Sequence, residues 1–371
     1  MTRSRISKAR RIVIKIGSSS LTGKAGSELD PSAVDRLVDV VVAARARGVE
    51  VAVVSSGAIA AGLAPLGLKT RPYDLATQQA AASVGQGILI HRYTESFARH
   101  NVTASQILLT TQDVIHRSHY QNAQRTLNRL LALEVVPVIN ENDTVVTQEI
   151  RFGDNDRLAA LVSLLIGADL LVIISDIDAL YDAPPSFAGA NRISEVESVN
   201  DVDEASVGGV GKSGVGSGGM VTKVEAARIS TSAGIPMLLT SLQQASDALL
   251  GIDVGTLFHS QPSRTNSRLL WLAHASTPHG RLVIDAGAVD ALLNRGVSLL
   301  PAGVTAVEGE FSAGDAVEIA SHEGLVIARG LVAFDSAEIP QMLGRSTKEL
   351  AKELGPEYER ELVHRDDLVL I

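Results

Sequence analysis

The sequence predicts an α/β protein with an open, mostly parallel sheet sandwiched by helices, followed by a small, mostly β domain. Up to about residue 260, short apolar runs alternate with helical segments, a pattern typical of parallel strands that are buried on both faces. Aromatic residues make up only 3% of the chain, so the core must be built from Val, Leu, Ile and Ala. Beyond residue 260 the spacing changes to short strands and glycine turns.

The length indicates two domains, because 371 residues are too many for one ordinary hydrophobic core. The stretch HSQPSRTNSR at 259–268 is polar and contains a proline, as linkers often do. We therefore expect a larger domain at 1–262, a linker at 263–279 and the small domain at 280–371.

The strands and helices of the larger domain follow from apolar runs and their boundary residues. RIVIKIG at 11–17 is a short apolar strand that ends in a glycine turn. Asp30 followed by Pro31 predicts a helix start, and Gly48 ends that helix. The same reasoning predicts strands at 49–57, 102–110, 134–140, 170–175 and 235–240, and helices at 74–100, 120–133, 155–167 and 220–233, with Gly85 and Gly87 as weak points in the first of these four helices.

Composition and charge exclude several classes of protein. The chain has no cysteine, so disulfides and thiolate metal sites are excluded. The net charge is −9, and residues 280–371 contribute −8 of it, with 8 Lys/Arg against 16 Asp/Glu, which argues against nucleic-acid binding through bulk charge. The apolar run after the basic N-terminus is broken by Lys15, and the run at 158–175 is broken by Gly167 and Asp169. We expect a soluble, cytoplasmic protein without a membrane span.

In parallel sheets of this kind, ligands bind beyond the carboxyl ends of the strands. The first such end carries Lys15 inside an apolar strand, followed by Gly17 and three serines at 18–20. A lysine beside backbone and hydroxyl donors suits a phosphate. The alternative is an edge lysine whose ammonium group reaches water, and the stretch by itself does not separate the two.

Two further strand ends carry small or polar residues. Small residues at 55–62 would let a ligand approach backbone N–H groups at a helix N-terminus, although tight helix packing explains them at least as well. Ser175 ends the strand expected at 170–175 and Asp176 follows it, where turn chemistry is the alternative.

The stretch INENDTVVTQEIRFGDND at 139–156 contains three Asp, two Glu, three Asn and one Arg. Carboxylates for an ammonium group and amides with an arginine for a carboxylate would together bind an amino acid. The spacing of a calcium-binding loop is absent. We expect a hairpin that returns the chain to RFGDND. The alternative interpretation is a solvated acidic loop with Asx turns.

The glycine-rich stretch at 208–223 precedes a predicted helix, and seven of residues 208–219 are glycine. Such a loop can cradle phosphates, and Lys223 in the following helix can reach a transferring phosphoryl group. The pattern imitates a Walker A loop, but Ser206 stands where glycine is needed and no apolar strand precedes it. A flexible linker is the alternative. With Lys15, this second lysine indicates phosphoryl transfer by positioning and cationic stabilisation.

Six motifs occur in a diagnostic order: VIKIGSS, VSSGAIAAG, INENDTV, FGDNDRLAALV, LYD and GSGGMVTK. In this order they resemble the amino acid kinase family and, within it, the glutamate 5-kinases. The resemblance covers roughly residues 10–371, and the tail resembles the PUA domain that many members carry. INEND together with GDND separates this group from the aspartate, acetylglutamate, carbamate and uridylate kinases.

The resemblance implies transfer of the γ-phosphoryl group of ATP to the side-chain carboxylate of L-glutamate, the first step of proline biosynthesis. It also implies Mg²⁺ that binds with the nucleotide, feedback inhibition by proline, a homo-oligomer and functional pairing with glutamyl phosphate reductase. By the family motifs, Lys15 and Lys223 would hold the phosphoryl group, and Asp156 would orient both lysines. The implied glutamate-binding residues are Ser56, Gly57, Asn140, Asp143, Asp154 and Asn155, and the implied ATP-binding residues are Lys15, Ser175, Asp176, Ser217, Gly218, Gly219, Met220, Val221, Thr222 and Lys223.

Three positions depart from the family pattern. Arg151 stands where some relatives have lysine, and Ser175 and Ser217 replace threonine. All three keep the charge or the hydroxyl group, although arginine changes the geometry available to a carboxylate. The rival functions are another amino acid kinase, such as an acetylglutamate kinase, and an RNA-binding PUA protein, which the acidic tail disfavours.

Overall fold

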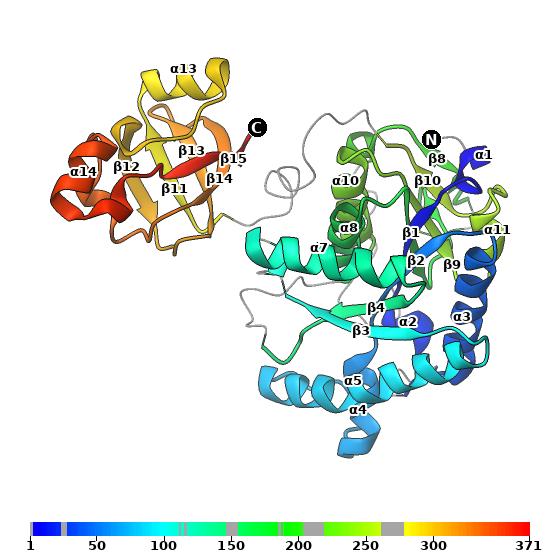
Figure 1. Cartoon of the computed structure of the whole chain (residues 1–371). Coiled ribbons are helices and arrows are strands. Elements are labelled where there is room, and N and C mark those ends of the chain that lie inside the picture. The colour runs from blue at the N-terminus through cyan, green and yellow to red at the C-terminus, as the bar shows by residue number, and fades with distance from the viewer. Residues whose placement is uncertain are drawn as a thin grey trace. The chain divides into compact units, whose positions relative to one another are not determined.

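The computed structural model describes residues 3–23, 28–110, 113–114, 117–145, 155–184, 187, 189–202, 219–260 and 278–371, without the side chains of residues 117, 118 and 366. Its contacts divide the chain into two compact units, Met1–Ser263 and Arg264–Ile371, each of which is described by itself (Figure 1). The linker predicted at 263–279 lies almost wholly outside the described residues, so those domain limits stay a prediction.

The first unit is built on an eight-stranded sheet with the order β3-β4-β2-β1-β5-β9-β10-β8. All neighbouring strands run parallel except β9 and β10, which pair antiparallel. This confirms the open, mostly parallel sheet. The strands are β1 Arg11–Ile16, β2 Glu50–Ser55, β3 Ala104–Leu109, β4 Val136–Glu141, β5 Leu170–Ser175, β8 Glu195–Val196, β9 Met237–Ser241 and β10 Thr256–Phe258, with a separate pair β6 Leu180–Tyr181 and β7 Arg192–Ile193.

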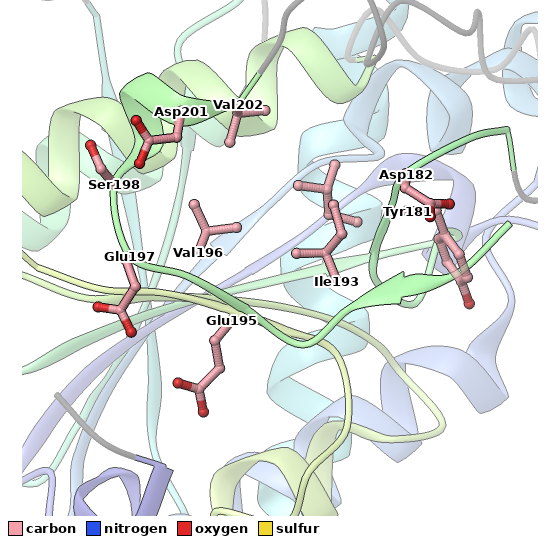
Figure 2. A pocket seen from close by; sticks show the side chains of 10 residues that line it. Tyr181, Asp182, Ile193, Glu195, Val196, Glu197, Ser198, Asp201 and Val202 are labelled. Atoms are coloured by element: carbon pink, nitrogen blue, oxygen red, sulfur yellow. The ribbon is translucent and has the colours of Figure 1, made fainter.

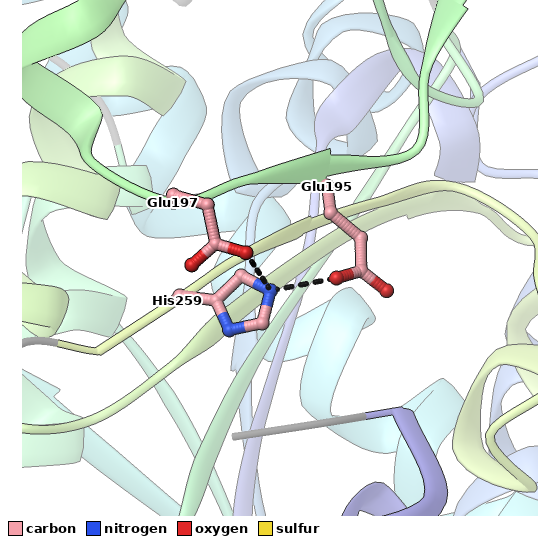
Figure 3. Close-up of side chains that lie close together, drawn as sticks. All are labelled: Glu195, Glu197 and His259. Carbon is pink, nitrogen blue, oxygen red and sulfur yellow. Dashed lines mark hydrogen bonds and ion pairs between the residues drawn. The ribbon is translucent and has the colours of Figure 1, made fainter.

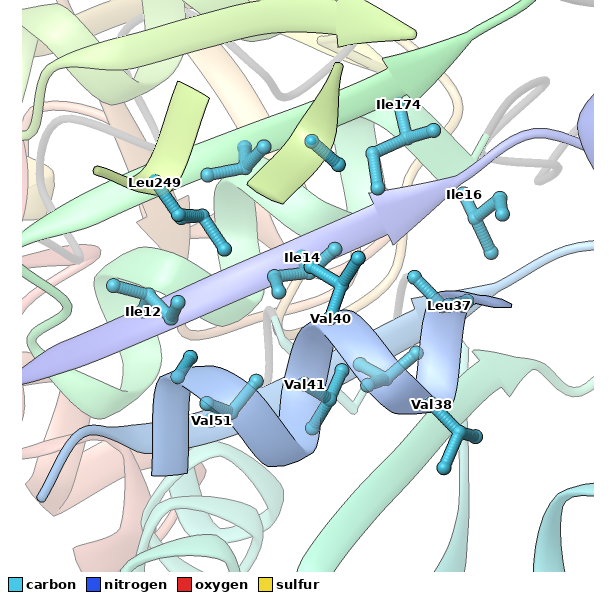
Figure 4. Packing of buried hydrophobic residues seen from close by; sticks show 14 of the residues in the cluster. Ile12, Ile14, Ile16, Leu37, Val38, Val40, Val41, Val51, Ile174 and Leu249 are labelled. Carbon is cyan, nitrogen blue, oxygen red and sulfur yellow. The ribbon is translucent and has the colours of Figure 1, made fainter. Parts of the chain in front are cut away.

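Helices cover both faces of this sheet (Figure 1). On one face, Ile12, Ile14 and Ile16 of β1 pack in a core with α3, α5 and α11, as Figure 4 shows for part of it. On the other face lie α7, α8 and α10, with α8 against β1 and α10 beside α8. The helices of this unit are α1 Arg3–Ile6, α2 Ser18–Leu21, α3 Pro31–Arg45, α4 Ala58–Leu63, η1 Ala64–Leu66, α5 Leu75–Ala98, α7 Arg117–Ala132, α8 Asn155–Ile166, η2 Val199–Asp201, α10 Met220–Ser232 and α11 Ala245–Leu249.

Side-chain caps set the starts of two long helices. The Asp30 carboxylate accepts a hydrogen bond from the backbone N–H of Ser32 at 2.9 Å, directly before Pro31 at the first position of α3. Asp74 accepts one from the backbone N–H of Thr77 at 2.8 Å at the start of α5. Both helices therefore begin where the sequence predicts, and every predicted strand and helix of this unit is present within a few residues. The strand β10, which pairs antiparallel with β9, and the short pieces α1, α2 and β6–β8 were not predicted.

The helix α5 contains a close crossing that the sequence analysis interpreted only as weakness. Gly62 of α4 and Gly85 of α5 face each other, and a Cβ atom on Gly85 would lie 1.8 Å from the backbone oxygen of Ala58. A Cβ atom on Gly62 would lie 1.9 Å from the backbone oxygen of Ala81. Both glycines are therefore required by packing, and α4 and α5 cross at backbone contact. The packing alternative for the small residues at 55–62 thus holds for Gly62.

The second unit is a five-stranded sheet with the order β12-β11-β13-β14-β15, in which only β11 and β13 pair parallel among the described strands. Its own core includes Leu282, Ile319 and Leu350. The mostly β prediction is confirmed, although helix α14, with its Ser346–Glu349 capping box, was not predicted. The elements are β11 Gly280–Ile284, α13 Ala286–Arg295, η3 Pro301–Gly303, β12 Val304–Gly309, β13 Ala316–Ser321, β14 Val326–Val332, η4 Ile339–Gln341, α14 Thr347–Leu354, η5 Pro356–Tyr358 and β15 Val363–Leu370.

Among the helices that the structure describes, none combines the length and the apolar character needed to cross a bilayer.

The α4–α5 crossing makes a testable prediction about stability. We expect Gly85→Ala to destabilise the protein by about 1–3 kcal/mol, because the new methyl group would meet backbone atoms that cannot move aside. Gly87→Ala on the same helix is the matched control: nothing lies within 4 Å of its Cβ position, so we expect a gain of about 0.5–1 kcal/mol. Thermal unfolding of the two variants measures the difference. Equal transition temperatures would contradict the packing role.

Candidate active site

Two buried lysines share one buried carboxylate at the carboxyl end of the central strands. The Nζ atom of Lys15 on β1 lies 2.6 Å from Oδ1 of Asp156, and the Nζ atom of Lys223 on α10 lies 3.2 Å from Oδ2. The Asp156 side chain is 0% exposed and the two lysine side chains are 4% and 7% exposed. We call these three residues the lysine–aspartate triad.

The fold explains how the lysine–aspartate triad forms. Successive side chains of a strand point to opposite faces, so Lys15 lies on the face of β1 opposite to Ile14 and Ile16, which is the face that α8 covers. Asp156 is in the first turn of α8, where the helix dipole favours a negative charge. Lys223 is in the first turn of α10, which packs beside α8.

The lysine–aspartate triad has two ammonium groups and one carboxylate, so its three side chains together carry a charge of +1. Burying ions costs free energy that a paired charge only partly offsets, and an excess positive charge in a buried place is stabilised by an anion. A phosphate or a phosphoryl group is an anion of this kind, with oxygens that accept hydrogen bonds. The alternative of an edge lysine that reaches water is excluded for Lys15 by its burial.

Three polar side chains beside the triad form a second group, which we call the amide cluster: Ser56, Asn140 and Asn155. The Nδ2 atom of Asn155 donates to Oγ of Ser56 at 2.8 Å and to Oδ1 of Asn140 at 3.0 Å. It also lies 3.2 Å from the backbone oxygen of Ser55. The ends of β2 and β4 and the start of α8 therefore meet at Asn155, which directly precedes Asp156 in the chain.

Two side chains of α5, neither of them predicted from the sequence, form hydrogen bonds with the amide cluster or with the neighbouring Ser55. The Oε1 atom of Gln86 accepts a hydrogen bond from Nδ2 of Asn140 at 2.8 Å. The hydroxyl groups of Tyr93 and Ser55 lie 2.9 Å apart, and burial raises the pKa of Tyr93, so the phenol stays neutral. The two residues are seven positions apart and so share one face of α5. That spacing, and the glycines on both sides of Gln86, were the only signals in the sequence.

The remaining predicted site residues lie around these two groups. Gly57 caps α4 with a φ of +105°, a backbone conformation that glycine adopts readily. Asp143 is partly buried just beyond β4. Ser175 ends β5 next to β1, and its hydroxyl donates to Asp176 at 3.0 Å. Gly219 caps α10, Met220 and Val221 begin it, and the Thr222 hydroxyl lies 3.1 Å from Oδ2 of Asp156. The predicted residues Asp154, Ser217 and Gly218, as well as Arg151, lie outside the described residues, as do residues 146–154, where the hairpin was expected.

The alternatives for the acidic stretch and the glycine-rich stretch can be compared with the described residues. Asn140, Glu141 and Asp156 are buried, whereas the side chains of a solvated acidic loop would be exposed. The helix predicted after the glycine-rich stretch does begin at Met220. Residues 208–218 of that stretch lie outside the described part of the chain.

A cavity of about 360 Å³ lies elsewhere in the first unit, between the β6–β7 pair and η2 (Figure 2). Its apolar lining includes Leu180, Ile193 and Val196, and Asp182 and Asp201 are among its acidic residues. Neither lysine of the triad and no member of the amide cluster lines it. We therefore treat this cavity as separate from the candidate catalytic groups.

A histidine between two glutamates lies at the edge of the sheet that β8 and β10 form (Figure 3). The Nε2 atom of His259 lies 2.8 Å from Glu195 and 3.7 Å from Glu197. Such a set of side chains can bind a divalent cation, but Arg3 also lies 3.5 Å from Glu195 and would repel one. We assign these side chains to the pairing of β10 with β8.

Comparisons with known proteins show the family of the chain. Residues 10–241 match the model of the amino acid kinase family, and residues 280–354 match the PUA domain. A glutamate 5-kinase of Streptomyces avermitilis is 61% identical over 99% of this chain and 98% of its own length. A glutamate 5-kinase of Salinispora arenicola is 60% identical over 100% of both chains.

Solved structures give the same fold. A carbamate kinase of Giardia lamblia bound to AMP-PNP matches with a TM-score of 0.50 and 19% identity, over 69% of this chain and 100% of that chain. At this identity the match concerns the fold alone. The family model covers more than half of the residues, and the relatives are similar over their whole length. The chain belongs to the amino acid kinase family and carries a C-terminal PUA domain.

Proposed function

We propose that this chain is an ATP-dependent phosphotransferase that converts L-glutamate to L-glutamyl 5-phosphate, the glutamate 5-kinase reaction. The observation that carries the proposal is the lysine–aspartate triad next to the amide cluster, because it combines a site for a transferring phosphoryl group with a site for an amino acid. The full-length relatives that bear the name glutamate 5-kinase support the choice of substrate.

In the proposed reaction, an oxygen of the glutamate side-chain carboxylate forms a bond to the γ-phosphorus of ATP. The bond from that phosphorus to the bridging oxygen breaks, and ADP leaves with the electron pair. Lys15 and Lys223 stabilise the charge on the transferring phosphoryl oxygens, and Asp156 holds both ammonium groups in place. A carboxylate is already ionised at neutral pH, so the reaction needs no general base.

The amide cluster is proposed to bind the amino-acid end of glutamate. The Oδ1 atom of Asn155 is shielded from water and accepts no hydrogen bond within the described residues, so it can accept one from an ammonium group. The Ser56 hydroxyl already accepts from Asn155, which leaves its proton for a carboxylate. Gly57, Asp143 and Asp154 complete the proposed glutamate site, and Ser175, Asp176 and 217–223 the proposed ATP site.

Magnesium is proposed to bind with ATP. Both oxygens of Asp156 are already engaged, Oδ1 by Lys15 and Oδ2 by Lys223 and Thr222, so this carboxylate fits the role of a lysine anchor rather than a metal ligand. Mg²⁺ commonly binds through substrate phosphates and few protein groups, and it would there neutralise phosphate charge.

The proposal also covers properties that follow from the reaction and the resemblance. An acyl phosphate is reactive, so we propose functional pairing with glutamyl phosphate reductase, which would consume it. From the resemblance we also propose feedback inhibition by proline. We propose a cytoplasmic location, where ATP and glutamate are available. The exposed apolar side chains of Val84 and Ile88 on α5 suit a contact in a homo-oligomer. The proposed domain limits are 1–262 for catalysis, 263–279 for the linker and 280–371 for the PUA-like domain.

Trapping of the product tests the proposed function. Purified protein with ATP, Mg²⁺, L-glutamate and hydroxylamine should form a hydroxamate in the same amount as ADP, because hydroxylamine captures acyl phosphates. N-acetyl-L-glutamate should be a poor substrate, because its nitrogen is an amide and cannot offer Asn155 the ammonium group that the proposed site binds. ADP release without hydroxamate, or a preference for N-acetyl-L-glutamate, would refute the proposal.

The proposed role of Lys223 predicts a specific kinetic change. We expect Lys223→Ala to lower kcat by about 10²–10³-fold, because one cation is lost where charge is spread over the transferring group, while KM for glutamate changes by only a few fold. Lys348→Ala, at an exposed position of α14, is the control and should keep both constants. A Lys223→Ala enzyme with unchanged kcat would rule out the phosphoryl role.

A further inference from the structure

We propose that Gln86 is a positioning residue that makes the site selective for a free α-ammonium group, by holding Asn140 and, through it, Asn155. This inference rests on the proposed function and adds a residue that does not itself touch the substrate. It starts from the hydrogen-bond chain that runs from Gln86 through Asn140 to Asn155.

Two backbone groups fix the orientation of the amide side chains in this hydrogen-bond chain. The backbone N–H of Glu141 can only donate, and it donates to Oδ1 of Asn140 at 2.9 Å. The Nδ2 end of Asn140 must therefore point to Gln86, whose Oε1 accepts from it. The backbone oxygen of Ser55 can only accept, so the atom of Asn155 that lies 3.2 Å from it is Nδ2.

As a consequence, Asn155 turns its acceptor to the site. Its Nδ2 group lies within hydrogen-bond distance of acceptor oxygens of Ser55, Ser56 and Asn140. Its Oδ1 atom accepts no hydrogen bond within the described residues. A buried acceptor without a donor is unfavourable, so a ligand that supplies a donor is stabilised there. An ammonium group has three donors and no acceptor, and therefore fits this oxygen.

Gln86 connects this hydrogen-bond chain to helix α5. It follows Gly85, whose backbone-to-backbone crossing with α4 sets the position of α5 closely. Without the Gln86 acceptor, Nδ2 of Asn140 would lose its described partner, and Asn140 could turn away from Asn155. Tyr93, on the same face of α5, supports Ser55 in the same way.

Three variants of helical glutamines test the role of Gln86. Gln86→Met has a similar size but accepts no amide hydrogen bond, whereas Gln86→Glu keeps an acceptor. Gln124→Met is the matched control, because the partly buried Gln124 of α7 also loses one amide hydrogen bond, in its case to the backbone oxygen of Leu165 at 2.9 Å. Thermal unfolding establishes that each variant is folded.

The measured quantity is the preference for L-glutamate over glutarate, which lacks the amino group. It is taken from kcat/KM in the hydroxylamine assay and from the ratio of dissociation constants in calorimetry. We expect Gln86→Met to reduce the preference about ten-fold, through the glutamate KM and with kcat and the ATP KM little changed. Gln86→Glu and Gln124→Met should keep it within about three-fold of the unsubstituted protein.

Two results would overturn the proposal. An unchanged preference in Gln86→Met would show that the chain does not act on the ammonium site. An equal loss in Gln86→Glu and Gln86→Met would show that Gln86 acts by packing alone. The unsubstituted protein separates this inference from the proposed function: absent turnover of glutamate refutes the reaction, while calorimetry of the same variants still measures the effect of Gln86 on amino-acid binding.

Discussion

The ion pairs of Asp156 with Lys15 and Lys223 are the interaction on which the rest of the site depends. A buried lysine is unfavourable unless its charge is compensated, and here one fully buried carboxylate pairs with two buried lysines, one on a strand and one on a helix. The three residues come from a strand and two helices that are far apart in the sequence. The folded sheet and its helices therefore bring two cations to one point, where we propose that the transferring phosphoryl group binds.

The amide cluster adds the second half of the site through the neighbouring residue. Asn155 and Asp156 are adjacent in the first turn of α8, so one helix start joins the amide cluster, which is proposed to bind glutamate, to the lysine–aspartate triad. Two side chains of helix α5 form hydrogen bonds here: Gln86 bonds to Asn140 of the cluster, and Tyr93 bonds to the neighbouring Ser55. The backbone contact between Gly62 and Gly85 keeps α5 close enough for these hydrogen bonds. Packing between two helices thus contributes to the geometry in which a small zwitterion would bind.

Much of the fold could be predicted from the sequence because its signals are local. Asp30 and Asp74 cap their helices, and the apolar runs of β1, β2 and β5 are typical of buried parallel strands. The antiparallel strand β10 could not be predicted in the same way, because three residues carry too little pattern. Lys15 and Lys223 stood out by their loops, whereas the placement of Asp156 between them came from the family resemblance.

Gln86 was missed for a physical reason. A glutamine within a helix is ordinarily a solvent-facing residue with good helix propensity, and only the crossing of α4 and α5 brings this one to Asn140. The glycines at 85 and 87 drew attention to the helix as a weak point, although only Gly85 is required for packing. Long-range contacts of this kind depend on the sheet order, which the spacing of residues within one helix does not reveal.

In the proposed reaction, a side-chain carboxylate attacks phosphorus at the lysine–aspartate triad, without a general base. Glutamate labelled with oxygen-18 only in its side-chain carboxylate tests this step. Capture of the acyl phosphate by hydroxylamine expels phosphate that keeps the bridging oxygen, so mass spectrometry of the released phosphate should find one labelled atom in each molecule. Unlabelled phosphate would mean that water, rather than the carboxylate, received the phosphoryl group, and would contradict the account.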